Sequence, residues 1–251
     1  MSYFKYCDKQ VYYEETGVGM PLVLLHGNTS CGRMFEQVIP LFAKKYRVIV
    51  LDFLGNGRSD RLAKWPSDLW FDWAMQVHAL CEHLGLKKIK VIGSSGGALA
   101  AINLALEYPG LVEGVVADSF EGLHADPGIT GQISSGRAQA KNYEGFCKYL
   151  HSLHGDDWEA VFDSDTDAVL RHAEEIGAFF HKPMEKLSVK MLLTGSLEDE
   201  MFPMGHCKAL FEEICKKTDY AKAHIFEHGG HPAMKSNKDE FVRICDSFFE
   251  S

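Results

Sequence analysis

A serine flanked by glycines is the clearest nucleophile in the sequence. Ser95 lies in the run Gly93-Ser94-Ser95-Gly96-Gly97, with one glycine two residues before it and another two residues after it. A serine at the tip of a sharp strand-to-helix turn has a strained backbone, and such a turn needs almost no side chain at those two positions. The free N–H groups of the following helix would favour developing negative charge. The pattern predicts covalent chemistry on Ser95, because the lysine and Ser/Thr of a phosphate-binding loop are missing.

A serine hydroxyl is a weak nucleophile at neutral pH, so it needs a histidine base whose tautomer an acid fixes. His231 is the best placed of the twelve histidines, because it follows the last strand-like run on a glycine-rich loop. Pro232 disfavours helical geometry at His231. His224 and His228 precede it closely, but acidic and cysteine partners at metal-ligand spacing are missing, and we expect no metal site.

The acid should come from the loop after the strand-like run at 189–193, which carries three consecutive carboxylates. We favour Asp199, because the order serine, acid, histidine accompanies a serine on a turn of this kind. Glu198 is one alternative. Asp118 is another, since it lies near the end of a strand-like run and would share the same edge of the sheet.

Strand-like and helix-like segments alternate along most of the chain. An apolar run at 21–25 ends in His26-Gly27-Asn28, and an amphipathic segment at 33–44 precedes a second strand-like run at 46–51. This alternation predicts an α/β fold with a mostly parallel central sheet flanked by helices. The other expected elements are a hairpin at 4–16, strands at 91–92, 113–120, 189–193 and 223–226, and helices at 68–84, 98–106, 204–217 and 237–249.

The alternation stops between residues 121 and 186, where aromatic residues are spaced through polar, helix-like segments. This insertion begins after one strand and ends before the last two. We therefore expect a helical cap (lid) over Ser95 at 121–186, and a core domain made of 1–120 and 187–251. An aromatic-rich cover excludes water and shapes a pocket. The candidate pocket residues are Phe120, Phe146, Trp158, Phe162, Phe179 and Met201.

Two further motifs have structural explanations. Residues 163–167 and Glu174 imitate a calcium-binding EF-hand loop, but Ala168 occupies the position of the glycine that this loop requires. We expect a helix start at 166–171 there and no calcium. The glycine-rich loop at 52–60 could hold a ligand at the carboxyl edge, but a tight structural turn is the favoured interpretation.

Composition narrows the possible partners and the compartment. A chain of 251 residues that is 46% hydrophobic can form one globular unit, and a net charge of −9 argues against nucleic acid. Seven scattered cysteines without a C-x-x-C motif favour a reducing compartment. No signal-like or membrane-spanning apolar run is present, so we expect a cytoplasmic protein without membrane contact. No protein partner is indicated.

Taken in order, the motifs resemble those of the α/β-hydrolase fold superfamily, in its capped, serine esterase-like form. They are H-G-N at 26–28, the run at 52–59, G-S-S-G-G at 93–97 and the loops of Asp199 and His231, and together they cover essentially the whole chain. The resemblance implies an oxyanion hole formed by the backbone N–H groups of Asn28 and Gly96. The chain departs from many relatives at Ser94, where they have His, Trp or Gln. It also has Glu198 at the position that the common G-x-x-D spacing gives to the acid, because the acid loop is one residue longer. Asp199 nevertheless keeps the usual D-x-x-x-P spacing to Pro203.

The expected activity is that of a serine hydrolase acting on ester bonds without a cofactor. The substrate should be a neutral ester or thioester of small to medium size with an apolar part. Between residues 121 and 186, twelve acidic residues against six basic ones would repel an anion. A C–C bond hydrolase or lactonase would use the same residues. A small-molecule sensor with a hydrolase fold and little turnover is an alternative of another class.

Overall fold

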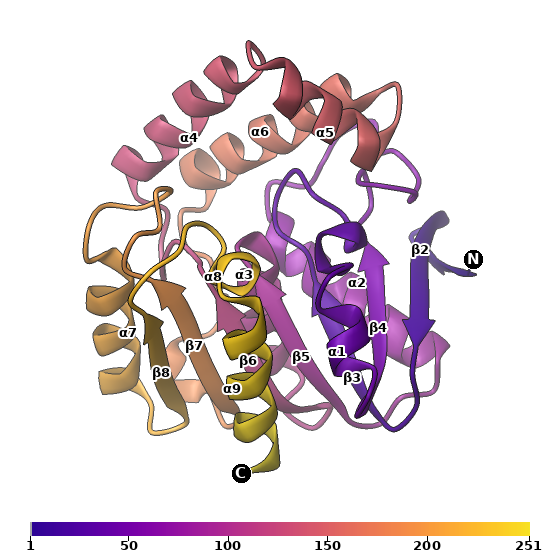
Figure 1. The fold of residues 1–251 in the computed structure, drawn as a ribbon. Coiled ribbons are helices and arrows are strands. Elements are labelled where there is room, and N and C mark those ends of the chain that lie inside the picture. Colours follow the sequence, from indigo (N-terminus) through magenta and orange to yellow (C-terminus); the bar gives the residue numbers. More distant parts are fainter. Residues whose placement is uncertain (1) are drawn as a thin grey trace.

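The computed structural model describes residues 2–251 and has an eight-stranded sheet between two layers of helices (Figure 1). The strand order is β1-β2-β4-β3-β5-β6-β7-β8. The strands from β3 to β8 are parallel to one another, whereas β1–β2 and β2–β4 pair antiparallel. The sequence-based prediction of a mostly parallel α/β fold is therefore confirmed. The strands are β1 (Ser2–Tyr6), β2 (Lys9–Thr16), β3 (Met20–Leu25), β4 (Tyr46–Asp52), β5 (Ile89–Ser94), β6 (Val112–Asp118), β7 (Lys190–Ser196) and β8 (Ala221–Phe226).

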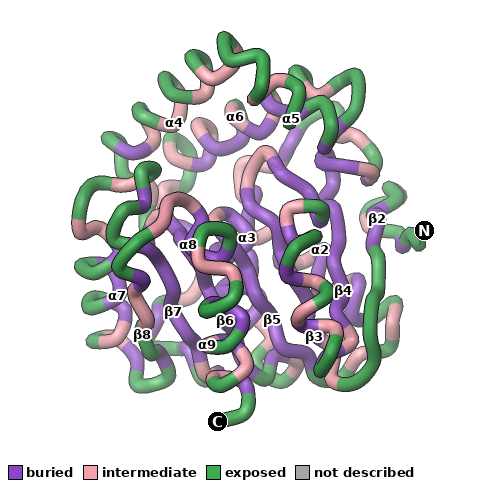
Figure 2. Tube along the Cα trace, in the orientation of Figure 1, coloured by how far each residue is buried: buried purple, intermediate pink, exposed green. Residues whose placement is uncertain are grey.

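Helices on the two faces of the sheet bury two apolar layers. In β3, Leu22 and Leu24 face the layer under the C-terminal helix, whereas Val23 and Leu25 face the opposite layer. Burial of each such side chain contributes roughly 1.5–3 kcal/mol, so the central strands hold the sheet together. Figure 2 shows this buried centre. The core helices are α1 (Ile39–Phe42), α2 (Leu69–His83), α3 (Gly96–Glu107), α7 (His206–Lys217), α8 (Ala233–Ser236) and α9 (Lys238–Glu250).

The amphipathic segment at 33–44 forms two short turns rather than one helix. A 3₁₀ turn, η1 (Gly32–Phe35), is followed by α1, whose second residue is Pro40. Proline has no N–H to bond the preceding turn, so it is tolerated only in the first turn of a helix. A single helix through Pro40 is therefore disfavoured.

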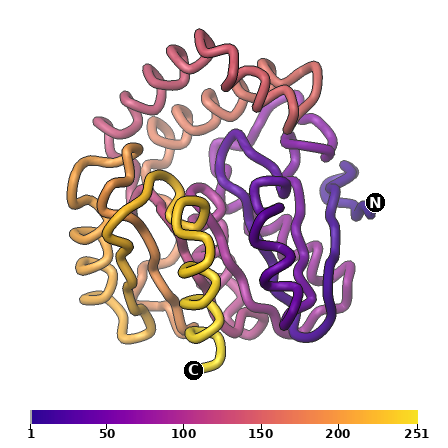
Figure 3. Tube along the Cα trace, in the orientation of Figure 1, coloured from indigo at the N-terminus to yellow at the C-terminus, as the bar shows by residue number. Residues whose placement is uncertain are grey.

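Three helices between β6 and β7 lie over the carboxyl edge of the parallel strands (Figure 1). They are α4 (Pro127–Ala140), α5 (Glu144–His154) and α6 (Trp158–Glu175), and we refer to residues 127–175 as the cap. One segment leads from the sheet into the cap and another leads back, and the path of the chain can be followed in Figure 3. The two segments pair through one antiparallel bridge between His124 and Ala178. A second 3₁₀ turn, η2 (Met184–Lys186), leads back into the core. The domain boundaries at 121 and 186 stay a prediction.

The segment that imitates a calcium loop is helical throughout. Helix α6 begins at Trp158, so the expectation that a helix starts at 166 is wrong. Asp157 precedes this helix and Glu159 lies in its first turn, where negative charge complements the helix dipole. Within residues 2–251, no group of three or more His, Cys, Asp or Glu side chains is arranged to hold a metal ion.

Candidate active site

The strand-to-helix turn at Ser95 is built as its glycines predict. Ser95 has φ 56° and ψ −125°, a conformation that is costly for a residue with a side chain. A Cβ at Gly93 would lie 2.1 Å from the carbonyl oxygen of Gly97, and one at Gly97 would lie 2.1 Å from that of Leu25. The Ser95 N–H donates to the Asp118 carbonyl at 2.7 Å. Close backbone approach on both sides therefore holds the serine at the start of α3.

His231 has its ring fixed by Asp199. Nδ1 of His231 lies 2.9 Å from Oδ2 of Asp199, and the other carboxylate oxygen accepts the Met201 N–H at 3.0 Å. The carboxylate accepts from Nδ1–H, which leaves Nε2 as the basic nitrogen. Ser95 and His231 line the same two cavities. The structure thus brings together the three residues favoured from the sequence, and their catalytic roles stay a prediction.

Glu198, the first alternative acid, points elsewhere. It is exposed, and its carboxylate lies 3.1 Å from Nδ1 of His228 and accepts the Gly229 N–H at 3.1 Å. The hydrogen bond from His228 lowers the pKa of Glu198. Although Glu198 stands at the usual family offset, this pairing directs it away from His231.

Asp118, the second alternative acid, lies buried beneath the turn. Its carboxylate accepts from Ser94 Oγ at 3.2 Å, from Thr194 Oγ1 at 2.8 Å and from the Met234 N–H at 3.1 Å. Burial raises the pKa of Asp118 to about 6. Within residues 2–251 it forms no hydrogen bond to His231, and its contacts join β5, β6, β7 and α8.

The two predicted oxyanion donors are neighbours. A Cβ at Gly96 would lie 2.1 Å from Oδ1 of Asn28, so the backbone of Gly96 is packed against the Asn28 side chain. Within residues 2–251, the backbone N–H groups of Asn28 and Gly96 donate to no other protein group. The Asn28 side chain is held instead, since Oδ1 accepts from Trp70 Nε1 and Nδ2 donates to Asp165 Oδ2, both at 3.0 Å. Gly96 directly follows Ser95, and a Cβ at Gly27, the residue before Asn28, would lie 3.4 Å from Ser95 Oγ. The role of the two N–H groups as oxyanion donors stays a prediction.

Two cavities meet at Ser95 and His231. The outer one has a volume of about 480 Å³ and lies between the loop after β3 and helix α5. The inner one has about 60 Å³ and lies under α4 and α6. Side chains from the cap and from α8 line the outer cavity, including Phe146, Tyr149, Leu150 and Lys235. The inner cavity is lined mainly by apolar side chains, among them Trp70, Leu99, Ile133, Val169 and Met201.

Of the six candidate pocket residues, two line a cavity at Ser95 and four do not. Phe146 lines the outer cavity and Met201 the inner one. The four that line neither cavity are Phe120, Trp158, Phe162 and Phe179. Phe120 packs near Phe211 and Phe162 against Phe146, with ring centroids 6.3 and 5.8 Å apart. Phe179 stacks on His172, while Trp158 is the half-buried first residue of α6.

Several residues that line the cavities were not predicted from the sequence. Leu99 carried a usable signal, because it lies four residues after Ser95 and therefore on the same face of α3. Trp70 carried none, since it belongs to a helix far from the serine in sequence. Only the packing of α2 against α3 brings its indole to the site.

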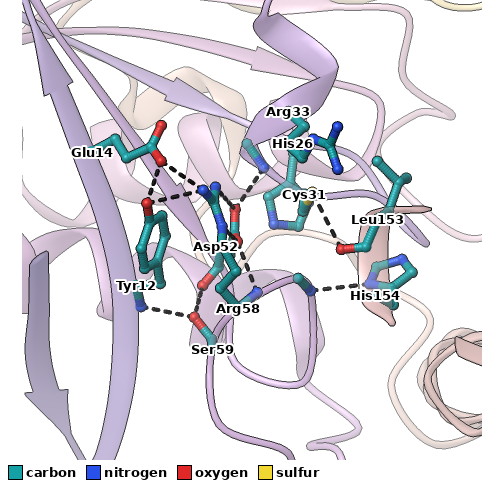
Figure 4. A network of polar contacts seen from close by, with 12 residues as sticks. Tyr12, Glu14, His26, Cys31, Arg33, Asp52, Arg58, Ser59, Leu153 and His154 are labelled. Atoms are coloured by element: carbon teal, nitrogen blue, oxygen red, sulfur yellow. Dashed lines mark hydrogen bonds and ion pairs between the residues drawn. The ribbon is translucent and has the colours of Figure 1, made fainter. Parts of the chain in front are cut away.

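The glycine-rich loop after β4 is a structural brace. The Asp52 carboxylate accepts the Gly32 N–H at 2.7 Å and both the N–H and Nε of Arg58 at 2.9 Å (Figure 4). Burial raises the pKa of Asp52, but the bonds and charge of Arg58 outweigh it and hold the pKa below its usual value. The guanidinium also lies 3.7 Å from the centroid of the Tyr12 ring. Arg58 is therefore engaged away from both cavities, as expected for a structural turn.

Comparison with known proteins agrees with this architecture. The family model for the alpha/beta hydrolase fold matches residues 20–135. Over 94% of its length the chain is 24% identical to 2-hydroxy-6-oxo-6-(2'-aminophenyl)hexa-2,4-dienoic acid hydrolase of Metapseudomonas resinovorans, of which 86% is covered. Over 96% it is 24% identical to 2-hydroxy-6-oxo-6-phenylhexa-2,4-dienoate hydrolase of Comamonas testosteroni, of which 91% is covered.

Solved structures share the fold at lower identity. An esterase from Exiguobacterium antarcticum superposes with a TM-score of 0.77 at 19% identity, covering 100% of this chain and 99% of the esterase. The enol-lactonase from Burkholderia xenovorans gives 0.76 at 15% identity, covering 100% of both chains. The chain therefore has the α/β-hydrolase fold. Within residues 2–251, no helix is long and apolar enough to cross a membrane.

Proposed function

We propose that the protein is a serine hydrolase that cleaves an ester or thioester of a small to medium, mainly apolar substrate. One observation carries the proposal. Ser95 is held at φ 56° where its hydroxyl shares both cavities with His231, whose ring Asp199 fixes at 2.9 Å. A strained nucleophile, an oriented base and free oxyanion donors are the parts that acyl transfer requires.

The proposed mechanism uses these groups in turn. Nε2 of His231 removes the Ser95 proton as the oxygen attacks the acyl carbonyl, and the backbone N–H groups of Asn28 and Gly96 receive the oxyanion. His231 then protonates the leaving group, which departs and leaves the acyl-enzyme. Water activated by His231 attacks this ester, and collapse of the second intermediate releases the acid and restores Ser95. No cofactor is needed for these steps.

The shapes of the cavities support a substrate with one short arm. A water molecule needs a cavity volume of about 10–15 Å³. The inner cavity of about 60 Å³ therefore admits only a few heavy atoms of a substrate. Leu99, Val169 and Met201 give it apolar walls. The outer cavity of about 480 Å³ accommodates the larger part of the molecule.

Hydrolysis of a C–C bond is the second candidate. It is favoured by relatives that match more than nine-tenths of the chain, two of which are named as hydrolases of dienoic acids. Such substrates carry a carboxylate, and Arg137 lines the inner cavity. However, Nη1 of Arg137 lies 2.7 Å from the buried carboxylate of Asp165, which already neutralises it. This pairing favours an uncharged group in the inner cavity, which supports the ester over a dienoate whose carboxylate lies there.

Labelling with a fluorophosphonate followed by a substrate panel tests the proposal. The wild-type protein and Ser94→Ala should be labelled, whereas Ser95→Ala should fold but not react. p-Nitrophenyl esters of graded acyl length should be turned over continuously, with the shorter acyl groups favoured, and a phenyl-substituted oxo-dienoate should react more slowly. Faster cleavage of the dienoate would establish the second candidate. Labelling without sustained turnover of any substrate would indicate a sensor.

A further inference from the structure

Side chains of the cap bind the strained backbone of Thr29, close to Ser95. Thr29 has φ 55°, a left-handed conformation that is unfavourable for a β-branched residue. Its N–H donates to Oδ2 of Asp165 on α6 at 3.1 Å, and its carbonyl lies 3.2 Å from Nε2 of His154 on α5. Two cap helices therefore hold Thr29 from both sides, directly after Asn28.

Asp165 connects this peptide to the proposed oxyanion donor. Its side chain is fully buried, and Oδ2 also accepts from Nδ2 of Asn28 at 3.0 Å. Oδ1 accepts from Arg137 at 2.7 Å, which balances the charge. A buried carboxylate that binds both the side chain of Asn28 and the next backbone N–H leaves little freedom for the backbone of Asn28.

His154 has a fixed role on the other side. Nδ1 accepts the Gly57 N–H at 3.0 Å (Figure 4). The hydrogen is therefore on Nε2, which donates it to the Thr29 carbonyl. Burial lowers the pKa of His154, which favours the neutral ring that this pair of bonds requires. The ring thereby joins the cap to the loop after β4 as well as to Thr29.

We infer that Asp165 and His154 are positioning residues, with which the cap holds the Asn28 backbone N–H in the place where it stabilises the oxyanion. The inference rests on the proposed function. It makes the cap part of the catalytic machinery as well as a wall of the pocket. Without Asp165, the strained Thr29 backbone can relax, and Asn28 moves with it.

A matched pair of variants tests this. Asp165→Asn removes the charge that holds the loop. Asp163→Asn removes a carboxylate of the same helix that also pairs with α4, through Lys141 Nζ at 2.6 Å, but is exposed. With p-nitrophenyl butyrate, Asp165→Asn should lower kcat by about tenfold to a hundredfold with KM little changed, since it weakens one oxyanion donor. Fluorophosphonate labelling of Ser95 should slow in proportion. Asp163→Asn should change neither rate.

Hydrogen exchange supplies a readout independent of turnover. Amides at 27–30 should exchange faster in Asp165→Asn than in Asp163→Asn. If the unpaired Arg137 prevents Asp165→Asn from folding, the double variant Arg137→Gln/Asp165→Asn should fold and show the same slow labelling. Equal losses in both single variants, a change in KM alone, or fast exchange with unchanged labelling would each overturn the inference. If the wild-type Ser95 is not labelled at all, the proposed function fails as well.

Discussion

The carboxylate of Asp199 lies 2.9 Å from Nδ1 of His231, although Asp199 is one residue beyond the usual family offset. The residue at that offset, Glu198, pairs with exposed His228 instead. One extra residue in the loop therefore supplies two adjacent carboxylates with different partners. Of the two, Asp199 is the one within hydrogen-bond distance of the His231 ring, which supports the prediction that it is the acid.

Substitution of these two acids should have opposite outcomes. Asp199→Asn should lower kcat for p-nitrophenyl butyrate by about 10³- to 10⁴-fold, because His231 loses the acceptor that fixes its tautomer. Glu198→Gln should change kcat by less than about threefold, since an exposed ion pair contributes little. Steady-state kinetics at pH 7.5 provides the comparison. A large loss in Glu198→Gln alone would transfer the role of the acid to Glu198.

The buried carboxylate of Asp118 should give stability a defined pH dependence. Its folded-state pKa of about 6 is above the usual value of about 3.9, so the folded protein binds more protons than the unfolded chain between these values. The contribution of Asp118 to stability therefore increases as pH falls from 6 towards 4. The free energy of unfolding of Asp118→Asn minus that of wild type should therefore be about 2 kcal/mol higher at pH 7.5 than at pH 4.5.

Urea unfolding of both proteins at each pH measures this difference, and the shared contributions of other groups cancel. A difference that does not vary with pH would show that Asp118 titrates normally. Because Asp118 does not bond His231, the same variant should retain kcat within about threefold.

The turn around Ser95 should not tolerate a methyl group. In Gly97→Ala the new Cβ would lie 2.1 Å from the Leu25 carbonyl oxygen, so the strand and helix must separate. We expect a loss of more than about 3 kcal/mol in the free energy of unfolding, together with loss of labelling. Gly110→Ala is the matched control, since nothing lies within 4 Å of its added Cβ. Similar stability of the two variants in urea would show that the turn can adapt.

Substrate charge should matter at low salt. The acidic surplus of residues 121–186 and the neutralised Arg137 both disfavour an anion. We therefore expect p-nitrophenyl butyrate to be hydrolysed faster than a hemisuccinate ester of similar size. An amino-acyl ester of matched length serves as the cationic comparison. A preference of about tenfold for the hemisuccinate would mean that a cation in one of the cavities is available to the substrate, and Lys235 and Arg137 would be the first residues to replace.

The parts of the site predicted from the sequence are those that depend on local geometry. Gly93 and Gly97 flank Ser95 because the turn permits no side chain at those positions. This requirement can be recognised from the local sequence alone. His231 and Asp199 were recognisable from their order on loops at one edge of the sheet. Strand and helix positions followed from periodicity for the same reason.

The features of the site that were not predicted depend on which face of a helix packs against which neighbouring element. Phe162 and Phe179 are aromatic residues of the expected segment, yet both are buried in packing between helices, with exposures of 2% and 1%. Asp165 was interpreted as part of an imitation calcium loop or as a residue near a helix start. Its partners Thr29 and Arg137 are distant in sequence, so only the folded chain shows what its charge does.

The bridge between His124 and Ala178 brings the two ends of the cap side by side, which makes the cap a natural unit for exchange between relatives. A transplanted cap would bring its own cavity walls. Unless it also brought a carboxylate and an imidazole to the places of Asp165 and His154, however, it would leave Thr29 unheld. Substrate choice and turnover would then change together, and a chimaera could lose activity while binding its new substrate well.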